Sequence, residues 1–139
     1  MDPLKIDLEI VTPQSLVMSE TVDDLVLPGS EGYLGVLPGH APLLTGLAAG
    51  EIVYHSGGRA RYLALSGGFA EVLQHRVSVL AETCERGEEI DVARATEARD
   101  RAKAELARAD ATEDDVRHAE AHLERAEVRI AVAKRVGTN

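Results

Sequence analysis

Apolar and polar residues alternate with a period of two along the first two-thirds of the chain. Between residues 4 and 10, leucine and isoleucine alternate with lysine, aspartate and glutamate, which predicts a strand with one buried face. Similar short apolar runs predict further strands at 22–27, 51–55, 59–65, 69–73 and 76–81. Many short strands at close spacing, without helices between them, predict an all-β sandwich or flattened barrel.

The period changes to that of a helix near residue 90. Apolar residues spaced three and four apart form one seam over 95–109 and a second over 116–133, which predicts two amphipathic helices. Thr112 and Asp115 have the spacing of a capping box at the start of the second helix, and Gly137 is placed to end it. We therefore predict an antiparallel helical hairpin, with a β-sandwich domain at 1–86 and the hairpin at 87–139.

Both helical seams consist mostly of alanine. Alanine buries little apolar area, and each Å² of buried apolar area contributes only about 25 cal/mol. The contact between the helices, and between the hairpin and the sandwich, is therefore expected to be weak. Two arrangements remain open at this stage: a hairpin that detaches from the sandwich and a hairpin that is permanently docked.

Composition narrows the class of protein. The chain has 139 residues and a net charge of −9, which argues against binding to nucleic acid because phosphate backbones select basic surfaces. No apolar run approaches the length of a membrane span, and the first residues lack the pattern of a signal peptide. The single cysteine, Cys84, cannot form an internal disulfide, which favours a reducing compartment. Ten of the fifteen basic side chains lie after residue 89, so if the chain binds an anionic ligand, this segment is where the ligand is expected.

Motifs of enzymes and metal sites are missing from the sequence. It contains no phosphate-binding loop, no nucleophile elbow, no HExxH and no CxxC pair, so no catalytic residue is proposed. His118 and His122 share a helix face and have a spacing that could bind zinc. Without a third ligand nearby, we interpret them as solvated surface residues and predict no metal site.

Three segments resemble one family in order and spacing. They are LPGSEGYLGVLPGHAPLL at 27–44, LSGGFAEV at 65–72 and VSVLAETCERGEEIDVARA at 77–95. Together they resemble the ε subunit of bacterial F-type ATP synthases, and the resemblance covers essentially the whole chain. It implies a non-catalytic subunit of the central rotor stalk, peripheral to the cytoplasmic face of the bacterial plasma membrane, which helps to couple proton flow to ATP synthesis.

The resemblance also implies partners. In the family the sandwich binds the γ subunit and rests on the c-subunit ring, while the extended hairpin reaches the α/β catalytic hexamer and restrains ATP hydrolysis. By this resemblance Glu31 and Tyr33 approach the c ring and His40 lies near γ. The alternative for all three is an ordinary turn residue, and for His40 a hydrogen bond to the local backbone.

The resemblance further implies an ATP site. Some bacterial members bind ATP through an I/L-D-x-x-R-A motif at the start of the first helix, and the chain has IDVARA at 90–95. No cofactor is required, but ATP is a possible regulatory ligand. The residues that match the family site are Glu85, Ile90, Asp91, Arg94, Ala95, Arg101, Arg125 and Arg129.

Part of this residue set has a simpler explanation. Asp91 is a good N-cap residue, and Arg94 and Arg101 have acidic neighbours one helical turn away. Arg125 and Arg129 lack such neighbours and repel each other at i,i+4. A group outside their helix should therefore compensate them, either ATP in a site near Arg94 or an acidic partner surface. The alternatives to a rotor subunit that senses ATP are a free-standing ATP-sensing regulator and a purely structural spacer.

Overall fold

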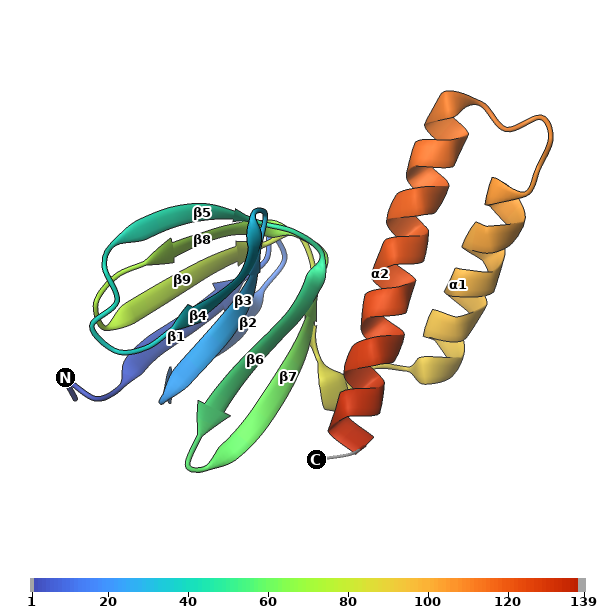
Figure 1. The fold of residues 1–139 in the computed structure, drawn as a ribbon. Helices are drawn as coiled ribbons and strands as arrows, with labels where there is room; N and C mark the ends of the chain where they lie inside the picture. The colour runs from blue at the N-terminus through green and yellow to red at the C-terminus, as the bar shows by residue number, and fades with distance from the viewer. Residues whose placement is uncertain (1, 138–139) are drawn as a thin grey trace.

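The computed structural model describes residues 2–137, which form a β-domain followed by two long helices (Figure 1). This arrangement confirms the predicted fold class. The strands are β1 Ile6–Val11, β2 Leu16–Val22, β3 Asp24–Gly29, β4 Gly32–Val36, β5 Leu43–Leu47, β6 Gly50–Ser56, β7 Arg59–Leu65, β8 Gly68–Val72, β9 Arg76–Ala81 and β10 Cys84–Arg86. A 3₁₀ turn at Gly87–Glu89 leads into α1 Val92–Leu106, and α2 spans Glu113–Gly137.

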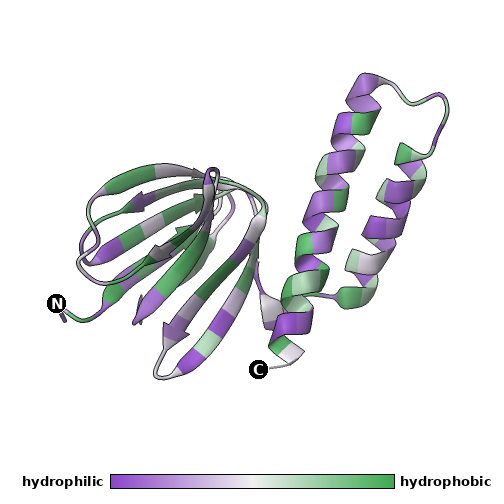
Figure 2. Cartoon of the chain, in the orientation of Figure 1, coloured by the Kyte–Doolittle hydropathy of each residue, from purple (hydrophilic) through white to green (hydrophobic). Residues whose placement is uncertain are grey.

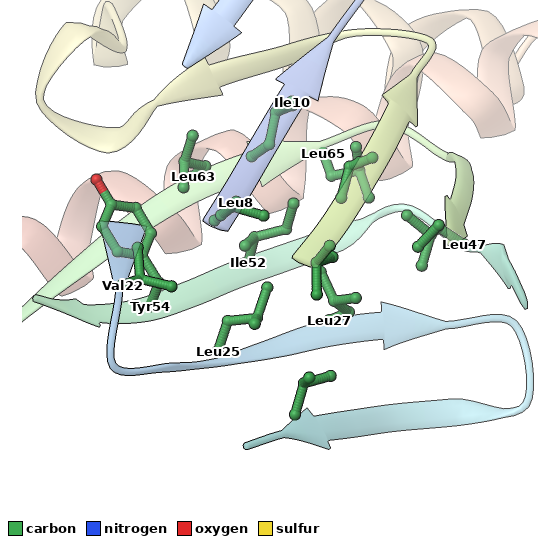
Figure 3. Close-up of a cluster of buried hydrophobic side chains, with 14 of the residues drawn as sticks. Leu8, Ile10, Val22, Leu25, Leu27, Leu47, Ile52, Tyr54, Leu63 and Leu65 are labelled. Atoms are coloured by element: carbon green, nitrogen blue, oxygen red, sulfur yellow. The ribbon is translucent and has the colours of Figure 1, made fainter. Parts of the chain in front are cut away.

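The strands form one sheet that folds over on itself. Its order is β10-β7-β6-β3-β5-β8-β9-β1-β2, and β4 pairs with β3 beside this path. Only the β1–β9 pair is parallel among the paired strands, and it places the first strand next to one from the end of the domain. Figure 3 shows the leucine, isoleucine and valine side chains that meet inside the fold.

The β-domain encloses an aliphatic core with one large aromatic residue. Alternate residues of β1, for example Ile6, Leu8 and Ile10, are at most 1% exposed, as the period-two pattern predicts. Tyr54 is also buried, and its hydroxyl donates a hydrogen bond to Glu20 Oε2 at 3.1 Å. Figure 2 shows that β6 and β7 each carry both hydrophilic and hydrophobic residues.

Both helices begin at the caps that the sequence predicts. The Asp91 carboxylate accepts the Arg94 backbone N–H at 3.1 Å. The Thr112 N–H donates to Asp115 Oδ2 at 3.0 Å, and the Asp115 N–H donates to Thr112 Oγ1 at 3.1 Å. These two reciprocal bonds form the predicted capping box. Neither helix combines the length and the apolar character that crossing a membrane would require.

The hairpin rests on the sandwich through the C-terminal end of α2 (Figure 1). A second small apolar cluster forms there from Ala64, Ile90 and Val132. Gly87 is buried beneath α2, facing Val132 and Val136. The structure therefore shows a docked hairpin, in which most of α1 and the connecting loop extend away from the β-domain.

Candidate anion-binding groove

A groove of about 420 Å³ lies between α1 and α2. Alanine residues from both helices line it, and Ala102, Ala119 and Ala126 are at most 4% exposed. A short side chain fills little of the space between two helices, while the longer side chains on either side form walls. The alanine seam thus produces a trough along the hairpin as well as a helix contact.

The walls of the groove are mainly basic. They carry Arg101 from α1 together with Arg125 and Arg129 from α2. The groove therefore brings together three of the four arginines that the family resemblance assigns to ATP. Guanidinium groups from two facing helices are well suited to bind phosphate, because each offers several donors in a fixed plane.

Arg129 has a partner within the chain. Its Nε donates to Glu85 Oε1, and the two side chains are 19% and 31% exposed. Glu85 lies on β10, 44 positions earlier in the sequence. A carboxylate of the β-domain therefore compensates Arg129. Arg101 and Arg125 have no ion pair among residues 2–137.

The IDVARA residues lie outside the groove lining. Asp91 caps α1, Ala95 is fully buried, and Ile90 packs with Ala64 and Val132. The Arg94 side chain is exposed and does not line the groove that Arg125 and Arg129 share. These four residues therefore have structural roles or free surface positions here, and their role in ATP binding stays a prediction.

The predicted partner-contact residues lie on strand β4 and on the turn and loop that flank it. Glu31 is exposed in the turn between β3 and β4. Tyr33 is also exposed, and its hydroxyl accepts the Glu51 N–H at 3.2 Å. His40 Nδ1 lies 2.6 Å from the Ala41 carbonyl oxygen, which is the local hydrogen bond considered as the alternative. Contacts of these residues with partners remain predictions.

The sequence did not indicate how α2 is held on the sandwich. Arg135 binds Glu51 at 2.9 Å and lies over the Tyr62 ring, 4.7 Å from its centroid. Burial raises the pKa of Glu51, and the Arg135 charge opposes that shift. Arg135 lies on the same helix as Arg129, six residues later, so two arginines of α2 bind carboxylates of the β-domain.

The sequence also did not place His118 and His122 in a site. Both line the groove beside Ala119. The basic residues at 118, 122, 125 and 129 follow each other on one face of α2, beside the alanine seam at 119 and 126. This spacing in the sequence could have indicated a basic wall. No group of three His, Cys, Asp or Glu side chains within the described part of the chain could hold a metal ion.

These features define the class: a β-sandwich that carries a two-helix hairpin with a basic groove. Residues 5–87 match the model of the ATP synthase delta/epsilon chain β-sandwich domain, and residues 88–134 match the long α-helix domain of the same chain. The chain belongs to the ATP synthase delta/epsilon chain family.

Relatives and solved structures agree with this family. The chain is 50% identical over 125 residues to the ATP synthase epsilon chain of Nitratidesulfovibrio vulgaris, covering 90% of this chain and 92% of that protein. It is 48% identical over 133 residues to ATP synthase epsilon chain 2 of Syntrophotalea carbinolica, covering 96% of each. A chain in the cryo-EM structure of the Euglena gracilis mitochondrial ATP synthase, OSCP/F1/c-ring, superposes with a TM-score of 0.80 at 26% identity, covering 99% of this chain and 83% of that one.

Proposed function

We propose that the chain works in the central rotor stalk of a proton-translocating ATP synthase, and that its hairpin restrains ATP hydrolysis unless ATP holds it folded. The subunit would lie peripherally at the cytoplasmic face of the plasma membrane. One observation carries the regulatory part of the proposal: Arg101, Arg125 and Arg129 reach a single groove from both arms of the hairpin.

An anion in this groove contacts α1 and α2 together, so it binds the folded hairpin better than the extended one. A ligand shifts a conformational equilibrium by its difference in affinity for the two states. ATP at high concentration would therefore keep the hairpin docked and away from the catalytic α/β hexamer. When ATP falls, the hairpin would extend and limit further hydrolysis.

Calorimetry with ATP on the isolated chain tests this proposal. Arg125→Ala should weaken ATP binding at least tenfold, because it removes a guanidinium that has no ion pair within the described residues. Arg117→Ala is the matched control, since Arg117 is an exposed arginine of α2 outside the groove. Equal affinities for the two variants, or no heat from the wild type at millimolar ATP, would refute ATP sensing through this groove.

The Glu85–Arg129 pair supports a second candidate function, a structural spacer without nucleotide binding. In that case Glu85 alone neutralises Arg129, and the groove needs no ligand. The same calorimetry distinguishes the two functions, because a spacer gives no ATP-dependent heat while it still assembles with the rotor.

The outer face of the sheet supports the proposed γ contact. Phe69 on β8 pairs with Leu80 on β9, Leu80 with Val11 on β1, and Val11 with Leu16 on β2. Phe69, Leu80 and Leu16 are 61%, 60% and 58% exposed. Val11 between them is half-buried, so the row exposes apolar side chains on three of its four strands, which is typical of a protein-binding surface.

Co-purification with γ tests this surface. Leu80→Glu should abolish γ binding, because it places a charge in the middle of the apolar row. Leu4→Glu is the control, since Leu4 is 76% exposed outside that row. Retention of γ by Leu80→Glu would exclude this face, and failure of the wild type to bind γ would favour a free-standing regulator.

A further inference from the structure

The rotor and ATP proposals leave two groove residues without a role, His118 and His122. They continue the line of basic residues on α2, because His118, His122, Arg125 and Arg129 follow each other at intervals of four, three and four. Side chains at such intervals lie about 5–6 Å apart on a helix surface. The α2 wall of the groove is therefore a row of four basic groups, two of which are imidazoles that become cations when protonated.

The geometry of His118 leaves one ring nitrogen available to the groove. Its Nδ1 lies 2.8 Å from the Asp114 carbonyl oxygen, so Nδ1 carries the hydrogen and donates it. In the neutral ring Nε2 is then an acceptor, which an anion does not bind. Protonation turns Nε2 into a charged N–H donor, which is the form that binds phosphate oxygens.

The charges that face these histidines change along the groove. At the end near the connecting loop, Glu105 comes from α1 and Asp115 from α2, while Arg101, Arg125 and Arg129 lie toward the sandwich. Both carboxylates are engaged elsewhere, since Glu105 binds Arg108 at 2.8 Å and Asp115 accepts the Thr112 N–H. The histidines therefore lie between three arginines and two carboxylates that already have hydrogen-bond or ion-pair partners.

We propose that His118 and His122 are part of the polyphosphate-binding surface and that their protonation tightens nucleotide binding. The groove would then respond to ATP and to protons together. This inference rests on the proposed ATP binding and adds two residues and a pH dependence to it.

The sign of the effect follows from charge. Two protonated histidines next to Arg125 repel it when the groove is empty, and a bound polyphosphate replaces that repulsion by attraction. A bound polyphosphate therefore favours the protonated form of both histidines. Since the bound state takes up protons, the affinity for the polyphosphate is higher at pH 6.0 than at pH 8.0.

Calorimetry with ATP at pH 6.0 and pH 8.0 tests this dependence. The double variant His118→Gln/His122→Gln should bind ATP at least tenfold more weakly than the wild type at pH 6.0 and within twofold at pH 8.0. Comparison at the same pH removes the protonation of ATP itself. His55→Gln is the matched control, because His55 lies on β6 and faces Asp24 at 2.7 Å.

A charge-fixed variant completes the experiment. His118→Arg/His122→Arg should bind ATP tightly at both pH values, since its groups stay protonated. A ratio of wild-type to Gln-variant affinity that is the same at both pH values would overturn the inference and leave ATP binding intact. Absence of ATP binding by the wild type at both pH values would refute the proposed ATP site, and this inference with it.

Discussion

Gly87 offers a way to loosen the hairpin without touching the groove or the β-core. It is buried in the 3₁₀ turn between β10 and α1, directly beneath the last turns of α2. A Cβ added there would lie within the contact distance of a Val136 methyl group, 3.2 Å from Val132 Cγ1 and 3.1 Å from the Tyr62 carbonyl oxygen. Its φ is outside the left-handed region, so Gly87→Ala acts through crowding and not through backbone strain.

The magnitude follows from the neighbours of the added methyl group. The Tyr62 carbonyl belongs to a sheet strand and cannot move far, so α2 has to yield. Inserting a methyl group into a packed contact typically costs about 1–3 kcal/mol. Since each 1.4 kcal/mol changes an equilibrium tenfold, the equilibrium constant for undocking of α2 should rise roughly 5- to 150-fold.

Hydrogen exchange measured by mass spectrometry is the assay. Amides of α2 after residue 127 should exchange faster in Gly87→Ala by that factor, while amides of β1 and β9 keep their protection. Gly137→Ala is the matched control, because a Cβ there meets no atom within 4 Å. Unchanged exchange in α2, or an equal acceleration in the core strands, would refute the inference that Gly87 holds the docking contact.

Three further outcomes are expected. Glu85→Gln removes the charge that Arg129 binds, so hydrogen exchange in the last turns of α2 should accelerate about fivefold, which corresponds to a loss of about 1 kcal/mol of docking free energy. Unchanged exchange would contradict a docking role for the pair. Hydrogen bonds from the Thr112 N–H and hydroxyl hold the pKa of Asp115 below its ordinary value near 3.8. The start of α2 should therefore be fully stabilised above that value and should lose this stabilisation as the pH falls through the lowered pKa. NMR should show that this pH dependence is absent from the Asp115→Asn variant. Burial, followed by the charge of Glu85, raises the pKa of Cys84 to about 12, so its thiol should react with a disulfide reagent at pH 8 roughly a thousandfold more slowly than free cysteine; rapid reaction in the native protein would count against this burial.

Local patterns predicted most of the secondary structure. Strands such as β7 and β9 and the capping box at Thr112 and Asp115 depend on near neighbours, which the sequence displays directly. The missed strands lack a clear alternating pattern. β2 has three adjacent apolar residues before a polar run, and β5 contains Thr-Gly and exposes both Leu43 and Leu44. β10 is only three residues long. Their pairing with neighbouring strands, and not their own periodicity, makes them strands.

The candidate site was predictable only in part, for a similar reason. The missing acidic neighbours of Arg129 correctly indicated a partner outside α2. For Arg125 the same expectation stays a prediction, because Arg125 has no ion pair among residues 2–137. The identity of the Arg129 partner depends on how the end of α2 lies across β10 and β7, which brings Glu85 to Arg129. Such a contact between distant residues depends on the packing angle of the whole hairpin, and helix periodicity does not determine that angle.

The alanine seam connects the expected weakness of the contact between the two helices to the groove that lies between them. Leucine at Ala102, Ala119 and Ala126 would bury more apolar area and hold the arms together, but it would also fill the trough between the basic walls. With alanine, part of the energy that holds the arms is left for a ligand to supply. A ligand that binds only the folded hairpin stabilises it by about 2.7 kcal/mol at a concentration one hundred times its Kd, which lies within the range estimated for the crowding at Gly87. A seam of small residues therefore suits a hairpin whose position depends on the occupancy of the groove, whereas a larger apolar seam would make the folded state independent of it.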